Sequence, residues 1–131
     1  MNLESRNKKF GIKRFIRSFK YSIQGLKYAY LNEQSMFIHA IGTILVVLLG
    51  VILKISTMEW FILVSLLCVI AVIELLNTAV EAICDLITLE KNDLVKIAKD
   101  SGSASAFLVS IVTFVVSLNI FIPKIITLIG A

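Results

Sequence analysis

The sequence predicts an all-α membrane protein, with one amphipathic surface helix and three transmembrane helices in a single domain, 1–131. Three observations support this fold class. Hydrophobic residues make up 58% of the 131 residues, more than an ordinary soluble domain carries. Two stretches, 36–53 and 104–122, contain no Asp, Glu, Lys or Arg, and a third, 60–89, contains three acids and no base. Each stretch is long enough to cross a bilayer as a helix.

The N-terminal part of the chain is strongly basic. Eight of the 13 Lys and Arg precede residue 28, against one acid, Glu4. Residues 1–9 are expected to form a flexible basic tail. Residues 10–31 alternate apolar and basic side chains at helical spacing, which predicts an amphipathic helix in the membrane interface. This charge places the N-terminus on the cytoplasmic side, and the absence of a nucleic-acid-reading module disfavours DNA or RNA as a partner.

The three spans are expected at 35–54, 60–89 and 103–122. A polar hinge precedes the first span, with Asn32 or Ser35 as its N-cap and Glu33 at the cytoplasmic surface. Just inside that span, His39 is expected to be an interfacial histidine rather than a catalytic one. The charged segment 90–100 is expected to be a cytoplasmic loop before the small residues that open the third span.

The second span carries one polar stripe. Glu74, Asn77, Glu81 and Asp85 are spaced by three, four and four residues, so on a helix they fall within an arc of roughly 80°. Three carboxylates on one apolar face repel each other and are costly to bury. A bound cation would remove this difficulty.

The predicted topology gathers the stripe with Glu33, Lys99 and Asp100 on the side where a cell keeps ATP. Carboxylates at a surface suit Mg²⁺ held jointly with phosphates, and a lysine suits a phosphate. Glu74, about 10 Å deeper than Glu81, could accept a proton from a hydroxyl. This favours phosphoryl transfer to a lipid alcohol. A cation- or proton-coupled carrier and a non-catalytic membrane anchor stay open as alternatives.

The segment Glu74-Leu-Leu-Asn-Thr-Ala-Val-Glu81, with Asp85 and the later Ala98-Lys-Asp100, resembles the signature of the small bacterial integral-membrane lipid kinases. This is the diacylglycerol kinase and undecaprenol kinase family. The resemblance extends over 14–122. It implies an ATP- and Mg²⁺-dependent lipid kinase in the bacterial cell membrane, active as a homotrimer with cytoplasmic active sites.

The resemblance also implies a role for each matching residue. Glu74 matches the catalytic base, and Glu33 and Glu81 match the magnesium carboxylates. Residues matching the nucleotide side are Arg14, Tyr21, Glu33, Asn77, Glu81, Asp85, Glu90, Asn92, Lys99 and Asp100. Residues matching the lipid side are Arg17, Glu74 and Ser103.

Two features bear on specificity. Relatives commonly have a histidine near Asn92, so nucleotide contacts there are expected to differ. Ile38-His39 and the turn with Glu59-Trp60 resemble the undecaprenol branch, whereas the residues from Asp100 to Ala104 resemble the diacylglycerol branch. Undecaprenol is the favoured substrate and diacylglycerol the alternative.

Overall fold

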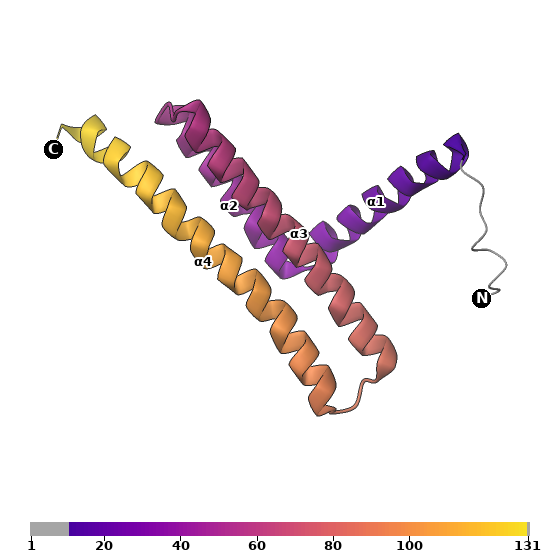
Figure 1. The fold of residues 1–131 in the computed structure, drawn as a ribbon. Helices are drawn as coiled ribbons and strands as arrows, with labels where there is room; N and C mark the ends of the chain where they lie inside the picture. The colour runs from indigo at the N-terminus through magenta and orange to yellow at the C-terminus, as the bar shows by residue number, and fades with distance from the viewer. Residues whose placement is uncertain (1–10, 131) are drawn as a thin grey trace.

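The computed structural model describes residues 11–130, and this part of the chain is all helical, without a strand. The helices are α1 (Ile12–Asn32), α2 (Gln34–Ile52), α3 (Thr57–Ile87) and α4 (Asp93–Ile129) (Figure 1). Three of them, α2, α3 and α4, are long and apolar enough to cross a membrane. The predicted all-α chain with three candidate membrane-spanning helices is therefore confirmed. The expected tail, 1–9, lies outside the described residues.

Helix α1 projects away from the other three helices, and a sharp corner at Glu33 joins it to α2 (Figure 1). Glu33 is the N-cap of α2 but its side chain makes no capping bond, so the predicted cap by Asn32 or Ser35 is wrong. The Asn32 amide instead donates to the Tyr28 carbonyl. Apolar side chains of α1 such as Phe15 are exposed. Such a face suits a lipid surface, and the placement of α1 in the interface stays a prediction.

The turn between α2 and α3 is fixed by a reciprocal cap. Ser56 Oγ accepts from the Glu59 N–H, and Glu59 Oε2 accepts from the Ser56 N–H at 2.6 Å. Beside it, Gly50 packs so closely on Trp60 that an added Cβ would lie 2.7 Å from the indole ring. This closely packed turn joins the end of α2 to the start of α3. We call this end of the bundle the far end.

Helices α3 and α4 form a long antiparallel hairpin that extends well past the N-terminus of α2 (Figure 1). Its loop is short, because Asn92 caps α4 by accepting from the N–H groups of Leu94 and Val95. Most of the segment expected to be a loop, 90–100, is thus helical. At the other end α4 continues through Pro123 to Ile129, so the helix does not stop at the proline as expected. Membrane helices tolerate such an interior proline.

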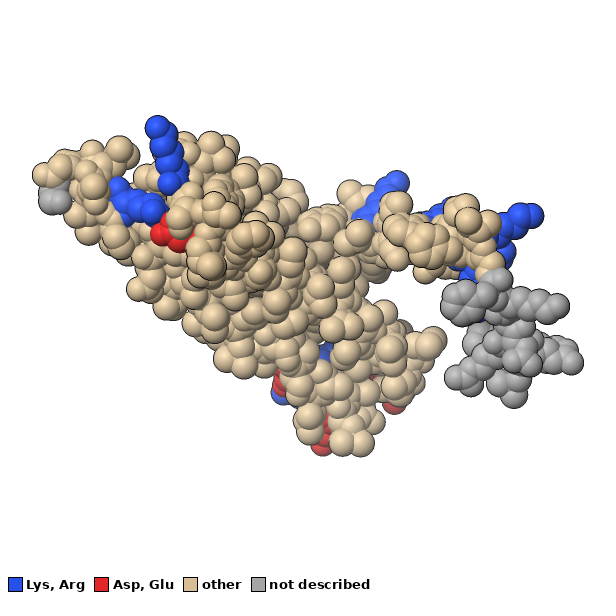
Figure 2. Space-filling view, turned by 45° about the horizontal axis from the view of Figure 1, so that its top comes forward, with Lys and Arg blue, Asp and Glu red and all other residues tan. Residues whose placement is uncertain are grey.

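Charged side chains lie along α1 and at the two ends of the bundle, with uncharged surface between them (Figure 2). At the far end Lys124 pairs with Glu59 at 3.1 Å, and at the hairpin loop Lys96 pairs with Asp100. This distribution suits helices whose central parts are in lipid.

Candidate active site

The most buried carboxylate among the described residues is Glu74, whose side chain is 5% exposed. Both of its oxygens face the start of α2. Ser35 Oγ donates to Oε2 at 2.9 Å, and His39 Nε2 lies 3.0 Å from Oε1. A buried carboxylate is stable only with such partners. Helix α2 therefore holds Glu74 at both oxygens.

The local sequence explains this arrangement. Ser35 and His39 are four residues apart and so share one face of α2. Two threonines satisfy nearby backbone oxygens: Thr43 Oγ1 donates to the His39 carbonyl at 2.8 Å, and Thr78 Oγ1 to that of Glu74 at 3.1 Å. Ser35 lies just after the corner between α1 and α2. Because Ser35 contacts Glu74, this carboxylate lies at the level where α1 leaves the bundle (Figure 1).

The middle of the stripe lies where α3 and α4 pack closely together. Asn77 Nδ2 donates to Glu81 Oε1 at 2.9 Å. The other amide atom, Asn77 Oδ1, is buried and has no hydrogen-bond partner among the described residues. It packs against Gly102, where an added Cβ would overlap it. The small residues near the start of α4 thus let this helix lie close to α3.

The end of the hairpin forms an open, charged pocket of about 520 Å³. Lys99 Nζ lies 2.5 Å from Asp85 Oδ1, and this ion pair bridges α4 and α3. Glu90, Asn92, Lys96 and Asp100 also line the pocket. Of the predicted nucleotide residues, the structure thus brings these together: Asp85, Glu90, Asn92, Lys99 and Asp100. Because Asn92 Oδ1 caps α4, its Nδ2 is the group left to contact a ligand.

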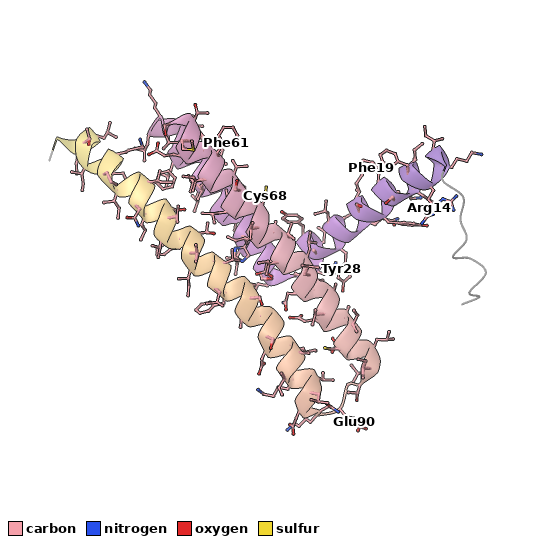
Figure 3. The ribbon with its side chains drawn as sticks, in the orientation of Figure 1. Arg14, Phe19, Tyr28, Phe61, Cys68 and Glu90 are labelled. Atoms are coloured by element: carbon pink, nitrogen blue, oxygen red, sulfur yellow. The ribbon has the colours of Figure 1, made fainter. Side chains whose placement is uncertain are left out.

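Other predicted site residues lie elsewhere in this single chain. Arg14, Arg17 and Tyr21 are exposed on α1. Figure 3 places Arg14 near the outer end of α1, well to the side of the bundle, and Glu90 at the hairpin loop. Ser103 is exposed on α4. The chain alone therefore does not bring the expected α1 contacts to the hairpin pocket.

The described residues include no group of three or more His, Cys, Asp or Glu arranged to hold a metal ion. Glu33 and Glu81, the expected magnesium carboxylates, are each half-buried, at the α1–α2 corner and on α3. Magnesium commonly takes one or two protein carboxylates and completes its shell with water and phosphate oxygens. The oxygen donors present, including the unpartnered Asn77 Oδ1 beside Glu81, fit that chemistry.

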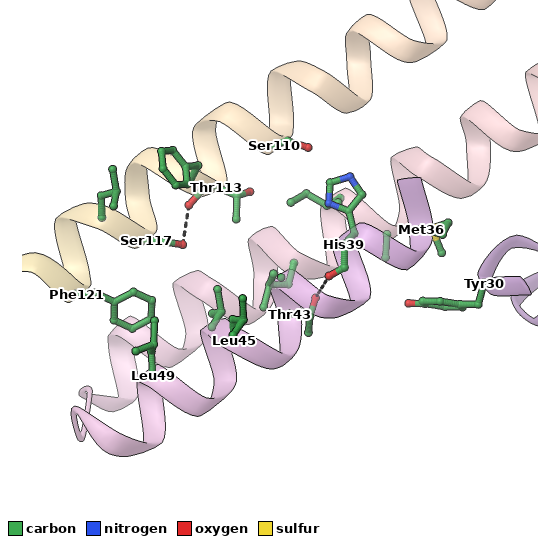
Figure 4. Close-up of a pocket in the computed structure, with 17 residues that line it drawn as sticks. Tyr30, Met36, His39, Thr43, Leu45, Leu49, Ser110, Thr113, Ser117 and Phe121 are labelled. Atoms are coloured by element: carbon green, nitrogen blue, oxygen red, sulfur yellow. Dashed lines mark hydrogen bonds between the residues drawn. The ribbon is translucent and has the colours of Figure 1, made fainter. Parts of the chain in front are cut away.

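An apolar cavity of about 350 Å³ lies between α2, α3 and α4, on the far-end side of His39 (Figure 4). Its serine and threonine hydroxyl groups are satisfied locally, since Thr113 and Ser117, for example, donate to the carbonyls four residues earlier. The ring of His39 lines this cavity, whereas Glu74 does not. The cavity can hold an apolar chain whose polar end meets the histidine.

Sequence reasoning missed Ser35 and His39 as partners of the buried carboxylate. The available signal was their four-residue spacing on the first turns of an apolar span, because polar residues inside a membrane are functional candidates by default. Nothing in the spacing alone shows that they face Glu74, 35 to 39 residues later in the chain.

Comparison with known proteins places this chain among membrane kinases. The family described as prokaryotic diacylglycerol kinase matches residues 20–121. The undecaprenol kinase of Bacillus subtilis is 30% identical over 93% of this chain and 99% of its own length. The diacylglycerol kinase of Haemophilus influenzae is 37% identical over 75% of this chain and 83% of its own length. The diacylglycerol kinase of Escherichia coli K12 is 31% identical over 86% of this chain and 94% of its own length. The chain therefore belongs to the prokaryotic diacylglycerol kinase family.

Proposed function

We propose that this protein is a membrane lipid kinase that transfers the γ-phosphoryl group of ATP to a lipid alcohol. One observation carries the proposal: the buried carboxylate of Glu74 lies between an apolar cavity and a charged hairpin end. A lipid alcohol needs the first environment and ATP needs the second. Along α3, Glu74 and Asp85 are eleven residues apart, or about 16 Å.

The hairpin pocket binds the nucleotide. Lys99 neutralises phosphate charge once ATP competes for its pairing with Asp85. Asn77, Glu90, Asn92 and Asp100 contribute polar contacts from the same two helices and their loop. Because phosphoryl transfer depends mainly on positioning and charge neutralisation, these contacts supply most of the required catalysis.

Glu33 and Glu81 hold Mg²⁺ together with the ATP phosphates. The bound ion supplies charge neutralisation on the transferring phosphoryl group. Replacing either carboxylate by glutamine is expected to raise the Mg²⁺ concentration needed for half-maximal activity. A magnesium titration identical to that of the unmodified protein would refute this assignment.

Glu74 is the basic group that drives removal of the proton from the lipid hydroxyl. Its carboxylate is buried, whereas the Asp85 and Asp100 carboxylates at the hairpin end are exposed, so Glu74 is the one placed to act on a hydroxyl in apolar surroundings. Arg17 and Ser103 contact the lipid headgroup. The lipid lies with its hydroxyl near Glu74 and its chain directed toward the middle of the bilayer.

Arg14 and Tyr21 contact nucleotide from the α1 helix of a neighbouring copy in a homotrimer. The separation of α1 from the hairpin pocket within one chain supports this arrangement (Figure 3). The basic N-terminal segment orients the protein in the bacterial cell membrane with α1 and the hairpin loop in the cytoplasm.

Undecaprenol is the favoured lipid and diacylglycerol the alternative. The undecaprenol kinase relative aligns along 99% of its length, and the Ile38-His39 pair belongs to the similarity with that branch. The diacylglycerol kinase relatives are of similar identity, so identity alone does not separate the two lipids. Purified protein should be given labelled ATP with each lipid separately and with both together. Preferential labelling of diacylglycerol would overturn the choice of lipid.

The carrier alternative makes a different prediction for the same protein. In liposomes, a cation- or proton-coupled carrier moves ions without ATP and labels no lipid. The proposed kinase labels lipid and gives no ion flux above that of protein-free liposomes. Ion flux without lipid labelling would therefore overturn the proposed function.

A further inference from the structure

The buried carboxylate of Glu74 has no open side in this structure. Ser35 occupies one oxygen and His39 the other, and the side chain is 5% exposed. The His39 side chain is 26% exposed and lines the apolar cavity, which Glu74 does not reach. A hydroxyl entering from the cavity therefore meets the imidazole before it meets the carboxylate.

The chemistry of the pair fixes which ring nitrogen is free. An ionised carboxylate only accepts hydrogen bonds, so His39 Nε2, 3.0 Å from Glu74 Oε1, must carry a proton when Glu74 is charged. In a neutral imidazole the other nitrogen, Nδ1, then has a lone pair. A base whose second nitrogen is oriented by a carboxylate is the usual arrangement for activating a hydroxyl.

We infer that His39 is a catalytic residue, which takes the proton from the lipid hydroxyl while Glu74 stabilises the resulting imidazolium. This rests on the proposed lipid kinase function and refines the role of Glu74. The lipid O–H bond breaks and its proton passes to Nδ1. The lipid oxygen bonds to the γ-phosphorus as the bond to the β-phosphate oxygen breaks, and that electron pair leaves with ADP. The imidazolium afterwards returns its proton to water.

Ser35 has a supporting position in this step. Its hydroxyl donates to Glu74 Oε2 on the same α2 face, four residues before His39. It holds the carboxylate so that the second oxygen points at the imidazole. A purely structural histidine would need only to donate to Glu74. A catalytic one must also accept a proton.

Two substitutions separate these roles. In His39→Gln the amide nitrogen can still donate to Glu74 but cannot take up a proton. His39→Ala leaves space beside a cavity of about 350 Å³, into which free imidazole can diffuse. Thr127→Val is the control for the loss of one side-chain hydrogen bond away from the site, because Thr127 Oγ1 donates to the Pro123 carbonyl near the end of α4.

The measurement is the single-turnover rate of phosphate transfer from ATP to the lipid alcohol, with ATP affinity and thermal unfolding in detergent measured alongside. We expect His39→Gln to bind ATP and unfold as the unmodified protein does, but to transfer phosphate at least about 100-fold more slowly. Added imidazole should raise the rate of His39→Ala and not that of His39→Gln. Thr127→Val should behave as the unmodified protein.

Transfer by His39→Gln at the unmodified rate would overturn the inference and leave Glu74 as the direct base. If His39→Ala does not fold, the His39→Gln result still decides. An unmodified protein that labels no lipid would instead overturn the proposed function itself, and the inference with it.

Discussion

Replacement of Gly102 by alanine tests whether the polar stripe depends on the close approach of α3 and α4. An added Cβ at this position would overlap Asn77 Oδ1, so the amide must move. Moving it strains the packing, at about 1–3 kcal/mol. Losing the bond from Asn77 to Glu81 leaves a half-buried polar group without its partner, at a further 1–3 kcal/mol or so.

The higher helix propensity of alanine opposes this loss of stability. Alanine is favoured over glycine inside a helix by about 1 kcal/mol. The net expectation for Gly102→Ala is thus a loss of about 1–5 kcal/mol in the free energy of unfolding. Gly25→Ala is the matched control, since nothing lies within 4 Å of a Cβ added there. It should be as stable as the unmodified protein or more so.

The assay is thermal unfolding in detergent together with phosphate transfer to lipid. We expect Gly102→Ala to unfold at a lower temperature and to lose activity. Adding Asn77→Ala should restore stability by removing the overlapping oxygen, but not activity. Gly102→Ala protein as stable and active as Gly25→Ala would refute the argument.

Three further predictions concern other contacts. Lys99→Met should weaken ATP binding measured by titration while changing thermal stability little, because the pair with Asp85 is exposed and such pairs contribute about 0–1 kcal/mol; unchanged ATP affinity would contradict it. Gly50→Ala should lower the unfolding temperature through its clash with Trp60 without changing the rate of the remaining folded protein, whereas an unchanged unfolding temperature would count against the packing argument. Ser35→Ala should lower the rate of phosphate transfer but not ATP affinity, and an unchanged rate would show that Glu74 needs no second partner.

The membrane-spanning helices were the most predictable part of the fold, because an uncharged stretch has few other ways to satisfy its backbone. The ends of α4 were less predictable. Asn92 starts the helix ten residues before the expected span, and Pro123 does not end it. Charge and proline content suggest a loop in water, but packing against α3 overrides both preferences.

The residue spacing correctly predicts that the polar stripe lies on one helix, but it does not show that the stripe faces two neighbouring helices, α2 and α4. Glu74 and Asn77 differ by about 60° around the helix axis, which is enough for one to face α2 and the other α4. Which neighbour each side chain meets depends on how three helices pack, and spacing along one helix carries no such information. For the same reason the spacing could not identify Ser35 and His39 as partners of Glu74.

Within one chain, the α1 residues that are expected to contact the nucleotide lie away from the hairpin pocket. If they contact ATP, they do so from another copy, and contacts between copies leave no periodic signal in one sequence. Arg14→Ala protein mixed with Glu74→Gln protein should regain activity if α1 completes a neighbour's site.

The most direct test of the central claim is the rate at which Glu74→Gln protein transfers labelled phosphate from ATP to a lipid alcohol. We expect single-turnover transfer to fall at least about 100-fold, because the buried carboxylate that assists proton removal is lost, while ATP affinity and thermal stability are kept. Transfer at the unmodified rate would contradict the claim that this buried carboxylate drives the reaction.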